Sequence, residues 1–297
     1  MGLLPLSYNR ISGFVIVLLL CFSLGLPPAT GQEPQGKRNE FSDLSQRLIQ
    51  DGFNPEKINL LFLSEQIFFT PSDVSLFFIH SESSLDYDQF IAPKPLAKAR
   101  EYMETHKESL EQAERIYGVD KTIIAAILLV ETQLGGYLGK RSVINTLATM
   151  AALTDKNLKE RIWESIPDHK KPDREKFERK VEKRSQWGYQ ELKALIQYTT
   201  REGIDPESIK GSYAGAMGIP QFMPSNALTL AKDGNNDGGV DLFNHADSIA
   251  SVANYLKHHG WRPDIPRQRQ HEVLFQYNHS NYYVDTLLKI SDKLKEG

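Results

Sequence analysis

Residues 123–131 read Ile-Ile-Ala-Ala-Ile-Leu-Leu-Val-Glu, and Gly135-Gly136 follow closely. The apolar part of this stretch shows no polar face at a 3.6-residue period, so as a helix it is predicted to be buried on all sides. Asp120 is a good N-cap, and the helix is expected to run from there to about Leu134. We therefore expect the fold to be built around this helix.

The acidic residue of the stretch, Glu131, stands where the helix dipole is itself negative. Dry walls and a repelling dipole both disfavour an ionised carboxylate, so the pKa of Glu131 is expected to be raised. A raised pKa is the condition for a general acid at neutral pH, and Glu131 is the first candidate catalytic residue. The alternative is a glutamate that simply reaches water beyond the last turn.

The start of the chain has the features of an export signal. Residues 1–31 carry one charge, Arg10, and the apolar stretch from residue 11 to 26 is shorter than the roughly 20 residues that a spanning helix needs. Small residues at 29–31 predict cleavage before Gln32, and hence an exported protein of the periplasm or cell envelope. The alternative is an uncleaved membrane anchor, the one form in which we expect contact with a membrane.

Composition excludes several classes of function. The 297-residue chain is 40% hydrophobic and 25% charged, which is typical of a soluble globular protein with a sizeable core. Loss of Arg10 with the signal would leave 34 basic against 38 acidic residues, which is no nucleic-acid footprint. Cys21 would be removed too, so the mature chain has no disulfide, thiolate metal site or cysteine nucleophile.

Most of the chain reads as helices. Residues 32–40 are polar and predict a disordered lead-in, and residues 41–93 form an N-terminal helical or irregular region. Within it, the stretch from 68 to 90 is read as two short strands or an extended arm. The charged stretch 168–184 predicts a solvated helix, within a variable helical insertion at 154–205. Further helices are expected at 42–50, 55–66, 96–117, 143–153, 158–166, 187–200, 224–232, 246–259 and 282–295.

Two further segments have the composition of a sugar-binding surface. Residues 211–225 are rich in Gly and Ala, which let a backbone approach a ligand closely, and Ser212 and Gln221 add hydrogen-bonding groups. Residues 277–283 read Tyr-Asn-His-Ser-Asn-Tyr-Tyr, in which aromatic faces could cover sugar C–H surfaces and amides could bind hydroxyls. The alternatives are a tight helix crossing for the first segment and a capped helix start for the second.

A fourth segment resembles an EF-hand loop. Asp233, Asn235 and Asp237 occupy its positions 1, 3 and 5, and a glycine follows at position 6. Position 12 is Asn244, which cannot supply a bidentate carboxylate, whereas Asp247 could do so in a widened loop spanning 233–247. The alternative is an Asp/Asn/Gly turn that binds no ion.

Taken together, these segments resemble the lytic murein transglycosylase B family of peptidoglycan-cleaving enzymes. The resemblance runs from about Leu96 to the C-terminus, while residues 41–92 match poorly and 154–186 is longer and more charged than expected. The matching motifs are Val130-Glu131-Thr132 with Gly135, Gly139-Lys140, Leu147-Ala148-Thr149, residues 211–225, residues 233–237, Ser251-Val252-Ala253-Asn254-Tyr255-Leu256, His259-Gly260-Trp261, and Tyr277-Asn278-His279-Ser280 with Tyr283.

This resemblance implies a mainly α fold, a lysozyme-like helical core with a smaller inserted subdomain, and a catalytic domain over residues 94–297. It implies cleavage of the β-1,4 bond between N-acetylmuramic acid and N-acetylglucosamine, with Glu131 as sole acid/base and no catalytic cofactor. Expected partners are peptidoglycan strands and the cell-wall synthesis or hydrolysis machinery, with no nucleic acid. By motif position, Ser212, Tyr213, Gln221, Asn278 and Tyr283 would line the sugar cleft, and Asp233, Asn235, Asp237 and Asp247 would hold a structural Ca²⁺.

One candidate carboxylate favours a particular reaction. Ordinary glycosidases use two carboxylates, spaced for a water or for a covalent intermediate. A single acid fits a reaction in which the muramic acid 6-hydroxyl is the nucleophile and a 1,6-anhydro ring forms. The alternatives are a lysozyme-like hydrolase on the same fold and a non-catalytic glycan-binding or Ca²⁺-dependent adhesion module.

Overall fold

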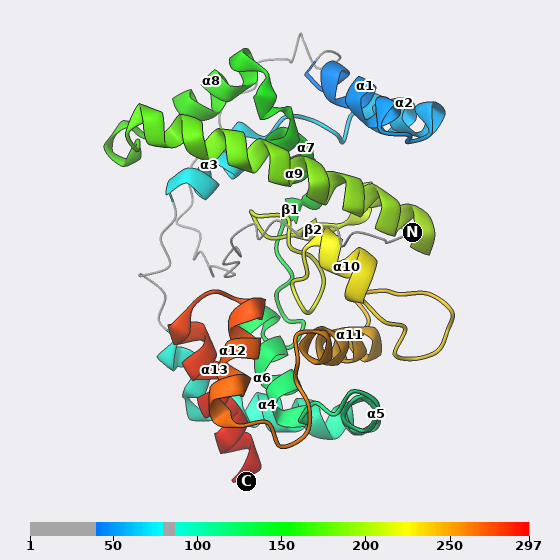
Figure 1. Ribbon diagram of the computed structural model, residues 1–297, viewed down its shortest axis with the longest axis vertical. Helices are drawn as coiled ribbons and strands as arrows, with labels where there is room; N and C mark the ends of the chain where they lie inside the picture. The colour runs from blue at the N-terminus through cyan, green and yellow to red at the C-terminus, as the bar shows by residue number, and fades with distance from the viewer. Residues whose placement is uncertain (1–39, 80–86, 297) are drawn as a thin grey trace, which may run out of the picture.

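The computed structural model describes residues 40–79 and 87–296, so the expected signal peptide and nearly all of the lead-in lie outside the described residues. The predicted mainly α fold is confirmed, because the only strands in the described ranges have two residues each (Figure 1). The α-helices are α1 (Ser42–Gln50), α2 (Pro55–Leu63), α3 (Pro71–Ile79), α4 (Pro93–Thr105), α5 (Lys107–Tyr117), α6 (Lys121–Thr132), α7 (Val143–Ala151), α8 (Lys156–Ser165), α9 (Arg174–Glu202), α10 (Pro224–Leu230), α11 (His245–His258), α12 (Arg267–Tyr277) and α13 (Asn281–Lys295).

Helix α6 is the buried helix that the apolar stretch predicts. Every residue from Thr122 to Thr132 is buried, which requires partners on all sides. Asp120 caps the helix, because its Oδ1 accepts the Thr122 backbone N–H at 2.9 Å. Helices α4, α5, α11 and α13 pack against α6 and form the lower part of the molecule in Figure 1. The core of this part is therefore centred on the helix that carries Glu131.

The upper part of the molecule is organised by α9, a single helix of 29 residues. It joins the charged stretch and the following amphipathic stretch, which the sequence predicted as separate helices. The charged half is anchored by Phe177 and Val181, both buried, and the Phe177 ring packs 5.1 Å from Trp163 and 5.0 Å from Phe78. An exposed ion pair between Glu175 and Arg179 forms on this charged half. Helix α9 packs on α7 and α10.

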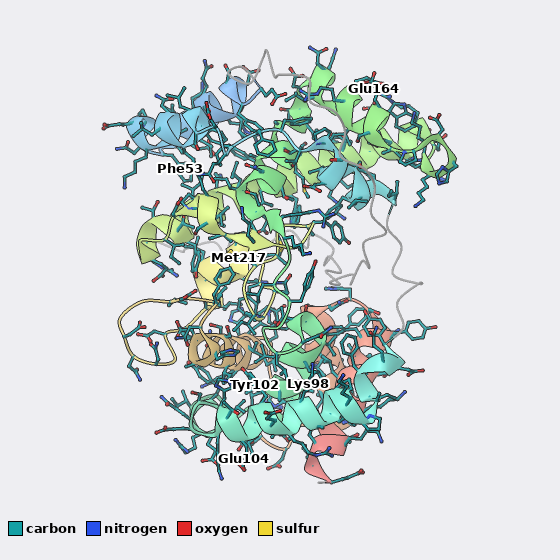
Figure 2. The ribbon with its side chains drawn as sticks, turned by 180° about the vertical axis from the view of Figure 1, so that it is seen from behind. Phe53, Lys98, Tyr102, Glu104, Glu164 and Met217 are labelled. Atoms are coloured by element: carbon teal, nitrogen blue, oxygen red, sulfur yellow. The ribbon has the colours of Figure 1, made fainter. Side chains whose placement is uncertain are left out.

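A minimal sheet joins the two parts. Strand β1 (Arg141–Ser142) pairs antiparallel with β2 (Lys210–Gly211), with Arg141 opposite Gly211. A Cβ on Gly139, whose φ is +89°, would lie 2.1 Å from the Gly211 carbonyl oxygen, so the close crossing here requires glycine. The 211–225 segment leaves β2 and crosses between the upper and lower helices, where Met217 lies in Figure 2. This crossing carries the candidate sugar-binding loop to the end of α6.

The N-terminal region corrects the prediction of strands at 68–90. Residues 67–70 have no regular secondary structure and lie along α7, since the Thr70 N–H is accepted by the Thr149 hydroxyl at 2.9 Å and Asn145 donates to the Gln66 carbonyl. The chain then forms α3, whose apolar residues pack on α7 and α8. A dense apolar run does not distinguish a short buried strand from a short buried helix, and packing decided the outcome.

Two further differences lie in the lower part. The long helix expected over 96–117 is two helices, α4 and α5, which meet at His106 without any Gly or Pro. Helix α12 was not predicted, because its sequence is largely polar and it buries only Val273 and Leu274. Within the described ranges, none of the helices combines the length and apolar character that crossing a bilayer requires.

Candidate active site

Glu131 lies one residue before the end of α6, and its side chain is 3% exposed. Burial disfavours its ionised form and raises the pKa of the carboxyl to about 8, against a smaller lowering by a hydrogen bond from Tyr283. The sequence-based expectation of a buried carboxyl with a raised pKa is confirmed. At neutral pH this group is mainly protonated, as a general acid must be.

Tyr283 is the side chain that contacts Glu131 directly. Its hydroxyl donates to Glu131 Oε1 at 2.5 Å, and both groups are buried. Ser280 caps α13 by accepting the Tyr283 N–H, which fixes Tyr283 in the first turn of that helix. Because burial and the nearby carboxyl raise the pKa of Tyr283 well above its usual value, the hydroxyl keeps its proton. The proton of the neutral carboxyl therefore belongs on Oε2.

Two other tyrosines complete the walls around this pair. The Tyr277 ring stacks parallel to Tyr283 at 6.5 Å, and its hydroxyl donates to the Pro220 carbonyl at 2.6 Å. Tyr87 approaches Tyr283 edge-on at 6.3 Å from just before η2 (Asp88–Ile91), in the N-terminal region. Neither was among the predicted site residues. Tyr277 lies in the quoted motif, whereas no local signal distinguished Tyr87.

Thr132 joins the end of α6 to the glycine-rich loop. Its hydroxyl donates to the Ile219 carbonyl at 2.9 Å and accepts the Gly135 N–H at 3.0 Å. The helix stops here because Gln133 and Leu134 both adopt left-handed conformations, with φ of 51° and 63°. The loop is thus held beside Glu131 at two successive carbonyls, those of Ile219 and Pro220.

Within the loop, the two predicted polar residues have different surroundings. Ser212 Oγ accepts the N–H groups of Ala214 and Ala216 at 3.2 and 3.1 Å, so its acceptor capacity serves the turn. Gln221 has a φ of 50° and is 4% exposed; its amide donates to the Gly218 carbonyl at 2.8 Å. Its Oε1 is buried and accepts no hydrogen bond from the described residues. Gln221 therefore retains an uncommitted acceptor, and sugar binding by Gln221 and by Ser212 stays a prediction.

The other two predicted sugar-binding residues, Asn278 and Tyr213, have different neighbours. Asn278 is 1% exposed and directly follows Tyr277, whose ring faces Tyr283. Tyr213 is half-buried, and its ring meets Phe77 at 5.7 Å. The Arg184 guanidinium lies 4.0 Å above the same Phe77 ring, and burial lowers the pKa of Arg184 to about 9. Tyr213 therefore belongs to a cationic and aromatic cluster that the sequence did not predict.

Comparison with known proteins places these features in a family. Residues 36–270 match the family described as Transglycosylase SLT domain. The chain belongs to this family. The match covers most of the chain and begins well upstream of Leu96, where the sequence resemblance began. The resemblance to lytic murein transglycosylase B is confirmed.

Individual relatives of this SLT-domain chain support its family assignment and its fold. The Membrane-bound lytic murein transglycosylase B of Escherichia coli (strain K12) is 32% identical over 173 residues, which are 58% of this chain and 40% of that protein. The chain thus matches about two fifths of that relative. The structure of the Escherichia coli lytic transglycosylase Slt35 in complex with calcium has a TM-score of 0.66 at 21% identity, over 87% of this chain and 93% of that chain. SltB3 from Pseudomonas aeruginosa in complex with NAG-anhNAM-pentapeptide has a TM-score of 0.71 at 18% identity, over 89% of this chain and 80% of that chain. The lysozyme-like helical fold is confirmed.

In this SLT-domain protein the EF-hand-like loop is closed by its own hydrogen bonds. Asp233 accepts the N–H groups of Asn236 and Gly238, and Asp237 accepts that of Gly239. Asp247 is 1% exposed and accepts the N–H groups of Gly234 and Asp241 at 2.8 and 2.7 Å. Burial and the nearby Asp233 carboxylate raise the pKa of Asp247.

The donor set of this loop fits calcium in chemistry but is not gathered around one point. Carboxylate and amide oxygens are the ligands that Ca²⁺ prefers. In the part of the chain that the structure describes, no three His, Cys, Asp or Glu side chains converge as a metal site. Asn244, at position 12, caps α11 by accepting the Ala246 N–H. The metal site therefore stays a prediction.

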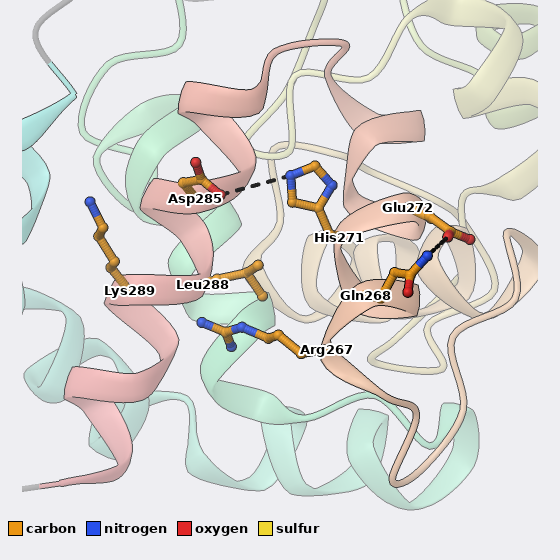
Figure 3. A pocket seen from close by; sticks show the side chains of 7 residues that line it. All are labelled: Arg267, Gln268, His271, Glu272, Asp285, Leu288 and Lys289. Carbon is orange, nitrogen blue, oxygen red and sulfur yellow. Dashed lines mark hydrogen bonds and ion pairs between the residues drawn. The ribbon is translucent and has the colours of Figure 1, made fainter.

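A hollow of about 530 Å³ lies elsewhere on the SLT-domain fold, between α12 and α13 (Figure 3). Leu288 lies in it, and His271 faces Asp285 across it at 3.8 Å. The other lining side chains are Arg267, Gln268, Glu272 and Lys289. Opposite charges compensate one another here, and no residue of the predicted site lines it. Glu131 and its surroundings remain the candidate active site.

Proposed function

We propose that this SLT-domain protein is a lytic transglycosylase. It would cleave the β-1,4 bond between N-acetylmuramic acid and N-acetylglucosamine in peptidoglycan and leave a 1,6-anhydromuramic acid end. The observation that carries this proposal is the buried carboxyl of Glu131, with a pKa of about 8, beside the loop that Thr132 and Tyr277 hold. The SltB3 complex with NAG-anhNAM-pentapeptide, a ligand with an anhydro sugar, supports it.

In the first step Glu131 acts as general acid. Tyr283 donates to Oε1, which leaves Oε2 to carry the proton that is transferred to the glycosidic oxygen. The bond from the anomeric carbon to that oxygen breaks, and N-acetylglucosamine leaves as the alcohol. The N-acetyl group of the muramic acid stabilises the cationic centre that remains. The hydrogen bond from Tyr283 then stabilises the newly formed Glu131 carboxylate.

In the second step the same carboxylate acts as base. It removes the proton from the muramic acid 6-hydroxyl, whose oxygen bonds to the anomeric carbon and closes the 1,6-anhydro ring. Glu131 regains its proton, and no water is consumed. Hydrolysis by the retaining route needs a second carboxylate about 5 Å away. Among the described residues no carboxylate contributes to the pKa shift of Glu131, as one about 5 Å away would.

The predicted sugar-binding residues keep their proposed roles. Gln221 offers a buried acceptor, and Asn278 and Tyr283 come from the loop and helix next to Glu131. Ser212 and Tyr213 would contact the glycan at the far end of the loop. The proposed catalytic domain is residues 94–297, with an insertion at 154–205 and the N-terminal region at 41–93.

Product analysis tests the proposal. Peptidoglycan is digested with the protein, and the soluble fragments are identified by mass spectrometry. We expect muropeptides lighter by one water than the corresponding lysozyme products and without a reducing end. Products with reducing ends would identify a hydrolase, and binding without release of fragments would identify a glycan-binding module. Either outcome contradicts the proposal.

We also propose that the 233–247 loop binds calcium and that the protein is exported to the cell envelope. Asp233, Asn235, Asp237 and Asp247 would hold the ion, which requires the loop to rearrange its present hydrogen bonds. The calcium complex of Slt35 supports the first proposal. The ion would act on the stability of the loop and take no part in the reaction. The second rests on the apolar stretch at residues 11–26.

A further inference from the structure

A second buried glutamate lies in the upper part of the molecule, where α9 meets α10. Glu191 is 5% exposed, its Oε2 accepts the Ser225 N–H at 2.9 Å, and its Oε1 accepts the Ser225 hydroxyl at 2.8 Å. Burial raises the pKa of Glu191 despite these two bonds. Both carboxylate oxygens are therefore committed to one serine.

This contact supplies a cap that α10 lacks locally. Met223 occupies the N-cap position and offers no side-chain acceptor, and Pro224 at the first position has no N–H. The first N–H that needs an acceptor is that of Ser225, and a side chain from another helix provides it. Glu191 thus fixes Ser225, the second residue after the 211–223 loop, to α9.

The same loop is held on its other side by the lower part of the molecule. Thr132 donates to the Ile219 carbonyl and Tyr277 to the Pro220 carbonyl. Four residues separate Pro220 from Ser225, and they include Gln221 with its left-handed backbone and available acceptor. The loop is therefore attached at one point to the helix that carries Glu131 and at the next to α9.

We propose that Glu191 is a positioning residue, which sets the place of the 211–223 loop, and so of Gln221, relative to Glu131. This inference rests on the proposed function, because it assigns the loop a role in holding the glycan. Glu191 contacts Ser225 and transfers no proton. Its loss lets the loop shift, and a misplacement of about 1 Å can cost up to about 100-fold in rate.

The test compares Glu191→Ala with Glu191→Gln on soluble glycan strands. Glutamine retains an oxygen for the Ser225 N–H, so we expect kcat/KM within about threefold of wild type. Alanine removes both bonds, and we expect kcat/KM to fall on the order of 10- to 100-fold, mainly through a higher KM. The pH at which activity declines, set by Glu131, should not move. Ser225→Ala, which keeps its N–H, should give a smaller loss than Glu191→Ala.

Glu202→Ala is the matched control. Glu202 also lies on α9 and accepts a backbone N–H, that of Val240 at 2.9 Å, but it holds the 233–247 loop. We expect it to lower the melting temperature without raising KM. Equal kinetic losses in Glu191→Ala and Glu202→Ala, or a wild-type KM in folded Glu191→Ala, would overturn the positioning role.

Binding separates this inference from the proposed function. Affinity for glycan strands is measured for Glu131→Gln alone and combined with Glu191→Ala or Glu191→Gln. Weaker binding with alanine, but not with glutamine, supports the inference even if wild type forms no anhydro product. Equal affinity in all three proteins would overturn the inference while leaving the proposed reaction intact.

Discussion

Two helix contacts each bury one glutamate: Glu131 lies where α6 meets α13 and Glu191 where α9 meets α10, at 3% and 5% exposure. At the first contact, Glu131 accepts one hydrogen bond, from a tyrosine hydroxyl, and burial raises its pKa to about 8. At the second contact, Glu191 accepts two bonds from Ser225, one of them from a backbone N–H. Burial is therefore common to the two glutamates, and their hydrogen-bond donors distinguish them.

The difference between the two glutamates follows from how many of their carboxylate oxygens accept a hydrogen bond. A carboxylate with both oxygens bonded to a helix start is a structural cap, whereas one with an uncommitted oxygen can hold and release a proton. Asp247 belongs with Glu191, because both of its oxygens accept backbone N–H groups. Buried carboxylates in this protein divide into caps and an acid according to their hydrogen bonds.

The largest expected effect separates the two glutamates directly. Glu131→Gln should lower turnover by about 10²- to 10⁴-fold, because the amide cannot supply or take up the proton. Glycan affinity should stay within a few-fold. Turnover is measured by release of soluble muropeptides, with Glu191→Gln as the matched control. A near-wild-type rate for Glu131→Gln would exclude Glu131 as the acid and remove the contrast.

Tyr283→Phe tests whether the single partner of Glu131 tunes it. The donated bond favours the ionised carboxylate, so its loss should raise the pKa of Glu131. We expect the alkaline decline of kcat/KM, near pH 8 in wild type, to move to higher pH, and the maximal rate to fall about 10-fold. Tyr282→Phe, on the same helix but 78% exposed, is the control. An unmoved decline would mean that another group sets it.

Stability gives an independent measure of the Glu131 pKa. The folded protein keeps the proton up to about pH 8, while the unfolded chain loses it near the ordinary value of 4.5. The folded state binds more protons in this window, so stability of wild type falls as pH rises through it. Between pH 5 and pH 8.5, the melting temperature of Glu131→Gln should rise relative to that of wild type by on the order of 5 °C. Glu104→Gln, an exposed change, should show no such trend. A constant difference would contradict the raised pKa.

The smallest effect concerns Asp247. A few millimolar calcium should raise the melting temperature by about 3 °C, and chelator should reverse the change. Asp247→Asn should abolish the shift, because it removes a carboxylate ligand. If wild type shows no shift, Asp247 is purely a cap, and the comparison with Glu191 becomes complete.

Local sequence predicted many of the helices and the polar motifs, and it failed where packing chose between similar patterns. The run Pro71–Ile79 became a helix because α7 and α8 cover it. The charged half of α9 continues into its amphipathic half because Phe177 and Val181 are buried in the hydrophobic core. The sequence does not predict α12, since its two buried residues carry too little periodic signal.

The sequence by itself determined that Glu131 would be buried at the end of an apolar helix, because nine consecutive residues carry that information. It could not determine the partner of Glu131, which lies 152 positions away on α13. Nor could it assign Glu191 to Ser225, 34 positions away. Whether a buried carboxyl becomes an acid or a cap depends on which donors the packed helices bring to its oxygens, and only the tertiary structure decides that.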